Sequence, residues 1–263
     1  MNAQNRRNTF ARSDWIEGMA RGMAVLECFD TERQRLNASQ TAERTGLTRA
    51  AARRHLLTLT ELGYLESDGH FYWLTPKVLG FAGSYLASAR LPRTVQPTLM
   101  QLSALTQTAC SVAVLQSDAV VIVARGVPLL SSTGQPVPTP LMAYGLHVGT
   151  RLPAHATSTG QVLLANQASP PSLPLPRLTP YTLTDPDAFA QRLREVAQQD
   201  HCWADQEHEL GIAALAVPLR NALGHTVAAL NMVHTHAQAS HTAWRARWLP
   251  VLQQTAQGLR PLL

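Results

Sequence analysis

The sequence has few cysteines, few charges and no long apolar run, and two of these shortages exclude whole classes of protein. Cys28, Cys110 and Cys202 lie far apart in 263 residues and in no metal-ligand spacing. An odd, sparse count argues against a disulfide framework and for a reducing compartment, so we expect three small buried residues. No segment reaches the roughly 18 apolar residues of a membrane-spanning helix, and the N-terminus lacks the apolar run of a signal peptide. We therefore expect a cytoplasmic protein without a membrane partner.

Charge is sparse and evenly divided in the first part of the chain. Charged residues are 15% of the sequence, low for a solvated surface, and hydrophobic residues are 45%, enough for one large core or for a small and a medium domain. The net charge of +5 and the pI of about 9.6 suit a polyanionic partner. Residues 1–76 nevertheless hold ten arginines and nine acidic residues, a net of +1. Any interpretation as a DNA-binding protein must therefore depend on where the arginines lie.

The segment 37–65 has the pattern of a helix-turn-helix, whose second helix enters the major groove of DNA. It opens with an N-cap, Asn37, followed by Gln40 in a weak capping-box pattern. Gly46 supplies the positive φ at which a first helix can stop, and Thr48 caps a longer second helix. That second helix turns arginines (Arg49, Arg53 and Arg54) toward one side and leucines (Leu56, Leu57, Leu59 and Leu62) toward another.

Two short aromatic-rich runs follow, separated by Asp68-Gly69, a dipeptide that favours a type I′ hairpin turn. A helix-turn-helix followed directly by a hairpin is a winged helix. Glu66 and Asp68 lie in this wing, so we expect it to add little attraction for phosphate.

Recognition of DNA needs donors in the major groove and cations near phosphates. Arg49 and Arg53 are four residues apart on one helix face and can pair with guanine or with phosphates, whereas Arg54 can turn toward the DNA backbone or another helix. Small alanines beside them let the helix approach base edges. The predicted DNA-binding residues are Ser39, Thr48, Arg49, Ala50, Arg53 and Arg54. The alternative, a merely solvated arginine face, does not explain why the turn, the helix lengths and the hairpin agree with the motif.

The rest of the chain alternates between helical and strand patterns. We expect helices over 17–29, 77–89, 94–108, 159–165, 186–199 and 242–259. We expect strands over 111–115, 120–124, 211–218 and 225–234. The Pro-, Gly- and Ser-rich segment 126–142 and the Pro-dense segment 169–176 should be loops. Helices flanking a mixed sheet would make the second domain α+β.

Five segments together resemble the IclR-type transcriptional regulators. DWIEGMARGMAVLECF, GLTRAAARRHLLTLTELGYL and LTPKVLGFAGSYL are similar to the N-terminal half of that family. VGTRLPAHATSTGQVLLA and DQEHELGIAALAVPLRNALGHTVAALNM are similar to its effector domain, a GAF-like α+β fold. The resemblance extends from about Asp14 onward and is strongest to the branch that controls β-ketoadipate and aromatic-acid catabolism.

The resemblance implies a ligand-responsive regulator of a catabolic operon with an α+β architecture. The expected parts are a disordered tail (1–13), a winged helix-turn-helix domain (14–76), a linker helix (77–91) and a GAF-like effector-binding domain (92–263). The expected partners are double-stranded operator DNA, a small aromatic or β-ketoadipate-type acid, and further copies of the chain in a homodimer or homotetramer. Neither enzymatic activity nor a cofactor is expected.

An effector site can be placed because an anion favours a helix N-terminus. The segment 155–160 opens a helix in that manner, and Ser158 and Thr159 add hydroxyl donors, although ordinary helix capping is an alternative role for them. The resemblance completes the pocket with Met142, Tyr144, Ala204, Asp205, Ala214 and Asn231. Arg125 and Arg151 are alternative partners for a carboxylate, or members of structural ion pairs.

Three other interpretations stay open at this point. His234 and His236 share a strand face near His225 and His241, but surface histidines explain them as well as a metal site does. An esterase would use Ser158 with His155, but the G-x-S-x-G pattern is absent. A small-molecule enzyme or binding module whose N-terminal domain serves only assembly is the remaining class.

Overall fold

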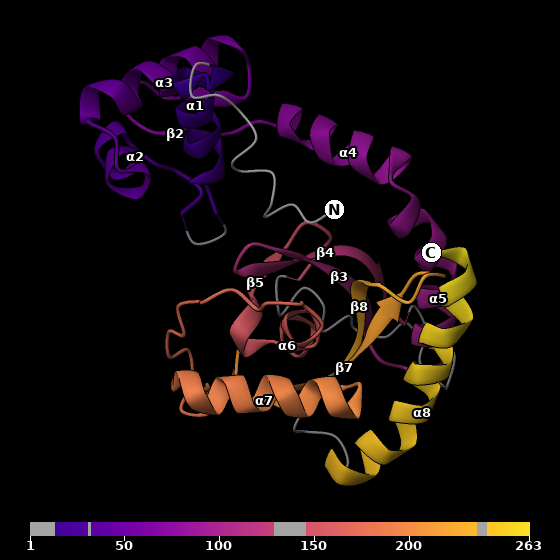
Figure 1. Ribbon diagram of the computed structural model, residues 1–263. Helices are drawn as coiled ribbons and strands as arrows, with labels where there is room; N and C mark the ends of the chain where they lie inside the picture. Colours follow the sequence, from indigo (N-terminus) through magenta and orange to yellow (C-terminus); the bar gives the residue numbers. More distant parts are fainter. Residues whose placement is uncertain (1–13, 31–32, 129–145, 236–240) are drawn as a thin grey trace. The chain divides into compact units, whose positions relative to one another are not determined.

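The structure is a computed structural model that describes residues 14–30, 33–128, 146–235 and 241–263 (Figure 1). The chain divides into two compact units, Met1–Tyr85 and Leu86–Leu263. The boundary falls inside the segment 77–91, where the sequence predicts a linker helix. Among the described helices, none is long and apolar enough to cross a membrane.

The first unit is a small helical domain with a two-stranded antiparallel hairpin. Its elements are α1 (Glu17–Glu27), α2 (Ala38–Thr45), α3 (Arg49–Glu61), β1 (Leu65–Ser67), β2 (Tyr72–Leu74), the 3-10 turn η3 (Pro76–Val78) and the start of α4 (Leu79–Ser88). Its core gathers apolar residues of all these parts except the last two, among them Val25, Leu36, Leu56, Leu65 and Tyr72. The predicted order of helices and hairpin is confirmed.

The hairpin turn differs from the prediction. Ser67 pairs with Tyr72, so residues 68–71 form a four-residue loop and not a two-residue type I′ turn. Only Gly69 in this loop has a positive φ, whereas a type I′ turn requires one at both central residues. The Asp68 carboxylate accepts hydrogen bonds from the backbone N–H groups of His70 (3.0 Å) and Phe71 (2.8 Å), which stabilises the wider turn.

The second unit is a layered α+β domain. Its helices are α5 (Arg90–Thr106), η5 (Ala154–Ala156), α6 (Ser158–Ala165), α7 (Pro186–Gln199), α8 (His241–Leu259) and η6 (Arg260–Leu262). Its strands are β3 (Cys110–Gln116), β4 (Ala119–Gly126), β5 (Arg151–Pro153), β6 (Cys202–Asp205), β7 (Ile212–Arg220) and β8 (Thr226–Thr235). The strands form one sheet in the order β5-β4-β3-β8-β7-β6.

Helices cover both faces of this sheet. α5 and α8 pack on one face, around Leu99, Leu215, Leu230 and Leu252. α6 packs on the other face and is itself covered by α7 (Figure 1). Every described strand pair is antiparallel, so the prediction of a mixed sheet is wrong. Short turns join β3 to β4 and β7 to β8, and such turns produce antiparallel neighbours.

Element boundaries were predicted well where the apolar pattern is long. The helix at Pro186 and the strands ending near Gln116 and Thr235 are confirmed within a few residues. The sequence did not predict β5 and β6, which are edge strands of three and four residues with no alternation to mark them. α5 also begins earlier than predicted, at Arg90, because a proline in the first turn of a helix loses no hydrogen bond.

All three cysteines are buried free thiols, as predicted. Burial raises the pKa of the Cys110 thiol to about 12 and raises that of the Cys202 thiol further. Such thiols stay protonated at neutral pH and behave as small apolar side chains.

Candidate DNA-binding and effector-binding sites

The helix-turn-helix forms with the caps that the sequence predicts. Asn37 Oδ1 accepts from the backbone N–H of Gln40 at 3.0 Å, and Gln40 Oε1 accepts from the backbone N–H of Asn37 at 3.0 Å, which completes the capping box. Gly46 ends α2 with a φ of 69°. Thr48 Oγ1 accepts from the backbone N–H of Ala51 at 3.2 Å and caps α3. α3 therefore starts at a fixed point in the turn.

α3 buries one side and exposes the other. Its buried residues are Ala52, Leu56 and Leu59. All four predicted DNA-binding residues within the helix are exposed: Arg49, Ala50, Arg53 and Arg54. The assignment of Leu57 and Leu62 to the apolar side is wrong, since they are 43% and 51% exposed. At 100° per residue Leu57 turns away from Leu56, and Leu62 lies at the C-cap, beyond the packed turns.

Among the described residues of this unit, the arginines of α3 differ from most other cations in having no partner. Three other arginines are paired with carboxylates: Arg21 with Glu17, Arg35 with Asp68 and Arg44 with Asp30. Within the described residues, the side chains of Arg49, Arg53 and Arg54 form no hydrogen bond or ion pair, and Arg33, beside the gap at 31–32, also has none. Their donors are therefore available to phosphate oxygens or base edges.

Ser39 and Thr48 lie at the N-terminal ends of α2 and α3, and both are exposed. The backbone N–H of Ser39 is already bonded to Asn37 Oδ1 at 3.0 Å, and Thr48 Oγ1 accepts from Ala51. What each residue can offer a phosphate is therefore its hydroxyl proton.

The wing uses its polar groups internally. The Arg35 guanidinium lies 4.5 Å from the centre of the Trp73 ring and pairs with Asp68 at 2.5 Å. Trp73 Nε1 donates to Glu66 at 3.1 Å. Hydrogen bonds from the backbone N–H groups of the turn hold the pKa of Asp68 below its usual value. The wing is thus well ordered by its own contacts and leaves little charge for DNA.

The second candidate site centres on the first turn of α6. Thr157 is the N-cap, because its Oγ1 accepts from the backbone N–H of Gly160 at 3.2 Å. Ser158 is only 1% exposed, and its Oγ has no partner among the described residues. Thr159 is buried as well. The capping role considered for Ser158 therefore belongs to Thr157.

The position of this turn is fixed by its close contact with η5. A Cβ added to Gly160 would lie 2.1 Å from the Ala154 carbonyl oxygen. No side chain can be accommodated there without movement of the backbone. The N-terminus of α6 is therefore held tightly against the segment that precedes it.

A polar row crosses the sheet face that α6 covers. Arg125, Ser111 and Asn231 are successive cross-strand partners on β4, β3 and β8, and directly opposed side chains share a face. Ser111 Oγ donates to Asn231 Oδ1 at 2.5 Å. Arg125 donates to the Leu146 carbonyl through one terminal nitrogen, while its Nε is buried without a partner in the described part of the chain.

The structure brings together most of the described residues that were predicted to bind the effector. Ala204 and Ala214 are cross-strand partners in β6 and β7, on the face covered by α6. Asp205, the next residue of β6, pairs with Ala213 on the opposite face, so its prediction as an effector-binding residue on this face is wrong. Asn231 lies on the same face, two strands from Ala204. Met142 and Tyr144 lie outside the described residues.

Of the two alternative arginines, only Arg125 belongs to this face of the central sheet. Arg151 is exposed on the edge strand β5, where it donates to Gln116 Oε1 at 2.5 Å. It is therefore placed as a surface residue at the sheet edge. Burial lowers the pKa of Arg125 from its usual value, which reflects the loss of water around its guanidinium.

In the part of the chain that the structure describes, the histidines do not form the arrangement that an esterase or a metal site would need. His155 Nε2 lies 3.0 Å from the Pro176 carbonyl oxygen, and no contact with Ser158 is seen. Among the described residues, no group of three His, Cys, Asp or Glu could hold a metal ion. His234 is completely buried among the rings of Trp203, His241 and Trp244, so its interpretation as a surface histidine is wrong. His236 lies outside the described residues.

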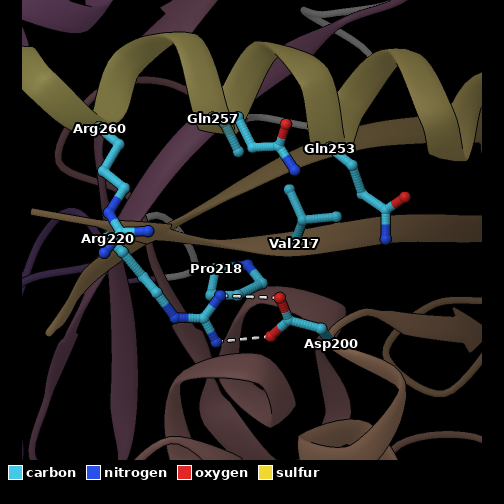
Figure 2. Close-up of a pocket in the computed structure, with 8 residues that line it drawn as sticks. Asp200, Val217, Pro218, Arg220, Gln253, Gln257 and Arg260 are labelled. Carbon is cyan, nitrogen blue, oxygen red and sulfur yellow. Dashed lines mark hydrogen bonds and ion pairs between the residues drawn. The ribbon is translucent and has the colours of Figure 1, made fainter. Parts of the chain in front are cut away.

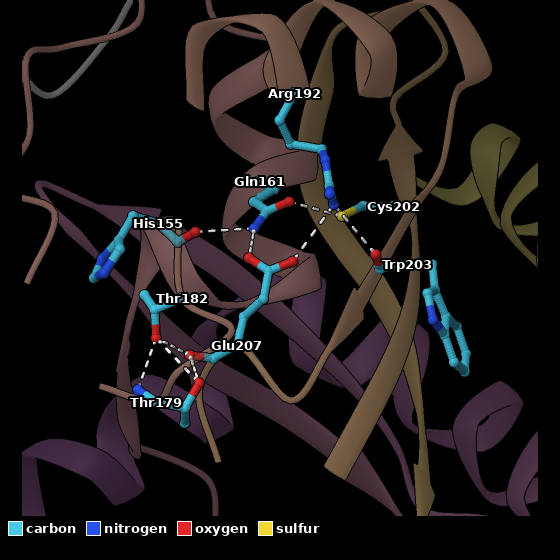
Figure 3. Close-up of polar contacts among 8 residues, drawn as sticks. All are labelled: His155, Gln161, Thr179, Thr182, Arg192, Cys202, Trp203 and Glu207. Atoms are coloured by element: carbon cyan, nitrogen blue, oxygen red, sulfur yellow. Dashed lines mark hydrogen bonds and ion pairs between the residues drawn. The ribbon is translucent and has the colours of Figure 1, made fainter. Parts of the chain in front are cut away.

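Sequence reasoning missed four polar residues of this region: Ser111, Gln161, Arg192 and Glu207. Gln161 and Glu207 are buried, and Arg192 pairs with Glu207 at 3.4 Å (Figure 3). The only signal was the position of Gln161 in the helix that begins at Ser158, and of Glu207 two residues after Asp205. A lone glutamate in a polar loop gives no sequence sign that it will be buried.

A separate cleft of about 250 Å³ lies between β7 and the end of α8 (Figure 2). Two arginines line it, Arg220 and Arg260. Arg220 donates to both carboxylate oxygens of Asp200, at 2.6 and 2.7 Å, and also to Asn166 at 3.2 Å. Because the charge and donors of Arg220 are already used within the protein, this cleft is a weaker candidate for an anion site than the α6 face.

Comparison with known proteins matches both units to one family. The IclR helix-turn-helix domain matches residues 18–69, and the bacterial transcriptional regulator IclR C-terminal domain matches residues 83–260. The chain is 46% identical to the Pca operon regulatory protein of Acinetobacter baylyi, over 95% of this chain and 90% of that protein. It is also 46% identical to the p-hydroxybenzoate hydroxylase transcriptional activator of the same organism, over 95% and 93% of the two chains.

A solved structure adds a ligand to this comparison. The second unit is similar to the inducer-binding domain of the PobR transcription factor from Acinetobacter, a double mutant in complex with 3-hydroxybenzoic acid. The TM-score is 0.58 and the identity 40%, over 65% of this chain and 98% of that one.

Proposed function

Because the chain belongs to the IclR family of bacterial transcriptional regulators, we propose that it controls a catabolic operon in response to a small aromatic or β-ketoadipate-type acid. In this proposal α3 binds operator DNA, and the α6 face of the second unit binds the acid. Membership of this family argues against the alternative, an enzyme whose N-terminal domain serves only assembly.

The unpaired arginines of α3 carry the DNA part of the proposal. Arg49 and Arg53 are exposed on a helix whose opposite side is anchored in the core, and neither is neutralised by a carboxylate in the described structure. Three of the other described arginines of the same unit are paired with carboxylates. The positive charge that has no carboxylate partner in the described part of this unit therefore lies mainly on α3, the helix proposed to enter the major groove.

Two buried polar atoms support the effector part. Ser158 Oγ and Arg125 Nε are both donors, both buried and both without a partner among the described residues. Buried donors without partners are costly, and a bound carboxylate would satisfy them. The Ser111–Asn231 pair beside Arg125 adds a further polar contact, and Ala204 and Ala214 present small apolar side chains on the same face.

A second copy of the chain is the third part of the proposal. α1 and the residue before it expose Ile16, Met19 and Met23 at helical spacing, and α4 exposes Leu79 and Phe81. Exposed apolar faces on a DNA-binding unit support pairing of two copies on a two-fold symmetric operator.

DNA binding is tested with the DNA upstream of the operon that the chain is expected to control. In a fluorescence-anisotropy titration we expect sequence-selective binding that weakens as salt is raised. Equal affinity for unrelated DNA at every salt concentration would contradict the regulator's proposed operator recognition.

Effector binding is tested by calorimetry with p-hydroxybenzoate, 3-hydroxybenzoate and β-ketoadipate. We expect at least one acid to bind the wild type, and Arg125→Ala to weaken that binding at least tenfold. Arg151→Ala is the matched control, because Arg151 is exposed at the sheet edge, and this variant should bind the acid as the wild type does.

A double variant, Ser158→Ala with Thr159→Ala, should weaken the response to the effector and leave operator binding without effector unchanged. If Arg151→Ala has the larger effect, the site lies elsewhere.

A further inference from the structure

A buried amide joins the first turns of α6 to three other segments (Figure 3). Gln161 is completely buried. Its Nε2 donates to the His155 carbonyl oxygen at 2.9 Å and to Glu207 Oε2 at 2.6 Å, and its Oε1 accepts from Cys202 Sγ at 3.1 Å. One side chain therefore fixes η5, β6 and the loop after β6 relative to α6.

Glu207 and its neighbour Gln206 extend these contacts to α7 and to the segment 179–182 that precedes it. Its Oε1 accepts from the Arg192 guanidinium on α7 at 3.4 Å. Its backbone carbonyl accepts from Thr182 Oγ1 at 2.6 Å, and Thr179 Oγ1 donates to the neighbouring Gln206 carbonyl at 2.6 Å. The loop that contains Glu207 is thus held through both carboxylate oxygens of Glu207 and through the backbone carbonyls of Gln206 and Glu207.

These contacts border the proposed effector site on two sides. Gln161 lies three residues after Ser158, which places both on one side of α6. Glu207 lies two residues after Asp205 and three after Ala204. The network therefore sets the spacing between the helix turn and the strand end that are proposed to hold the acid.

Stability alone does not account for a carboxylate at this position. Glu207 is 5% exposed, and burial raises its pKa, because water is lost around the charge and Arg192 compensates only in part. Replacing both members of a buried ion pair by well-packed apolar residues is often neutral or stabilising, so the pair itself is weak evidence for a stabilising role. The presence of a buried carboxylate that lowers stability is therefore better explained by a role in positioning the residues around it.

We propose that Gln161 and Glu207 are positioning residues for the effector: they hold the first turn of α6 and residues 204–207 at the separation that the acid requires, without touching the acid. This inference rests on the effector site proposed above. It assigns a role to two residues that lie behind the site and not in it.

The test compares Glu207→Gln with Glu209→Gln, an exposed carboxylate of the same loop that serves as matched control. Calorimetry with p-hydroxybenzoate and 3-hydroxybenzoate measures effector affinity, and anisotropy without effector measures operator affinity. We expect Glu207→Gln to weaken effector binding at least tenfold and to leave operator affinity within about twofold of wild type. Glu209→Gln should leave both unchanged.

A second pair of variants keeps the test decisive if Glu207→Gln does not fold. Arg192 is partly exposed, so its replacement disturbs the core less. Arg192→Met should weaken effector binding at least threefold, and Arg192→Lys, which keeps a cation beside Glu207, should restore it.

The outcomes separate the two proposals. Wild-type effector affinity in Glu207→Gln, or failure of Arg192→Lys to differ from Arg192→Met, overturns the positioning role alone. Parallel loss of effector and operator affinity assigns Glu207 to general stability and also overturns it. If the wild type binds neither acid, nor β-ketoadipate, the proposed effector site itself fails and this inference fails with it.

Discussion

Arg53 is the residue at which base reading and phosphate attraction can be told apart. If it pairs with a guanine, Arg53→Ala should weaken binding to the specific operator by about 1–3 kcal/mol and leave binding to unrelated DNA nearly unchanged. We expect this result because Arg53 lies on the exposed face of α3 with no partner in the described structure. Anisotropy on both DNAs measures it, and Arg21→Ala, which removes a cation already paired with Glu17, is the control. An equal loss on all sequences would assign Arg53 to phosphate.

Gly160 is predicted to tolerate no side chain. A Cβ would lie 2.1 Å from the Ala154 carbonyl oxygen, so Gly160→Ala must displace the start of α6 and should lower the free energy of unfolding by about 1–3 kcal/mol. Gly258 is a helical glycine with open space around its Cβ position, and Gly258→Ala should instead stabilise the protein by up to about 1 kcal/mol. Urea denaturation of the two variants measures both effects. A similar change in the two would show that the η5–α6 contact is not tight.

The ionisation of Glu207 should make stability depend on pH in a defined direction. Its pKa is raised in the folded protein, so the folded state binds this proton more tightly than the unfolded chain. The contribution of Glu207 to stability is therefore lost as pH rises from its unfolded toward its folded pKa. Glu207→Gln lacks this loss, so its free energy of unfolding relative to that of the wild type should increase as pH rises above about 4, the usual pKa of a glutamate. Urea denaturation at several pH values checks this, and a difference independent of pH would contradict it.

Among the elements, α2 depends most clearly on its cap. Both halves of the Asn37–Gln40 capping box are formed, and α2 has only eight residues. Asn37→Ala should lower the free energy of unfolding of the first unit by about 0.5–2 kcal/mol. Ser39→Ala, on the exposed side of the same turn, is the control. Thermal unfolding followed by circular dichroism would reveal the difference, and equal effects of the two variants would contradict the capping role.

Elements with strong local signals could be predicted from sequence, and those fixed by distant contacts could not. The caps at Asn37 and Thr48 and the turn at Gly46 act within a few residues, so their sequence pattern suffices. β6 exists because it pairs with β7, and its residues Cys202–Asp205 carry no alternation of their own. The turn at Asp68 also followed side-chain hydrogen bonds that its dipeptide does not specify.

The candidate effector site shows the same limit. Ser158 was predicted from the helix start at which it lies, and Asn231 from the resemblance of its segment to the family. The burial of Glu207 and the row Arg125–Ser111–Asn231 arise only when β3, β4, β6 and β8 assemble, and no local pattern encodes that assembly.

At the scale of the whole molecule, sparse charge sets the salt dependence of DNA binding. Each copy offers three arginines of α3, and two copies on one operator would offer about six phosphate or base contacts. The logarithm of the binding constant should then fall against the logarithm of salt concentration with a slope of about −5. Titrations across a range of potassium chloride concentrations measure this slope. A much steeper slope would mean that cations outside α3 also contact DNA.

The short outer strands of the large sheet have a consequence for assembly. Among the described residues, β5 and β6 have only three and four residues and cover only part of their neighbours β4 and β7, so each outer edge offers short runs of unpaired backbone N–H and C=O groups to an added strand. Copies of the second unit are therefore not expected to join into continuous sheets. Association through this unit is then expected to use its other surfaces, and two copies related by a two-fold axis would form a closed pair that does not propagate into fibres.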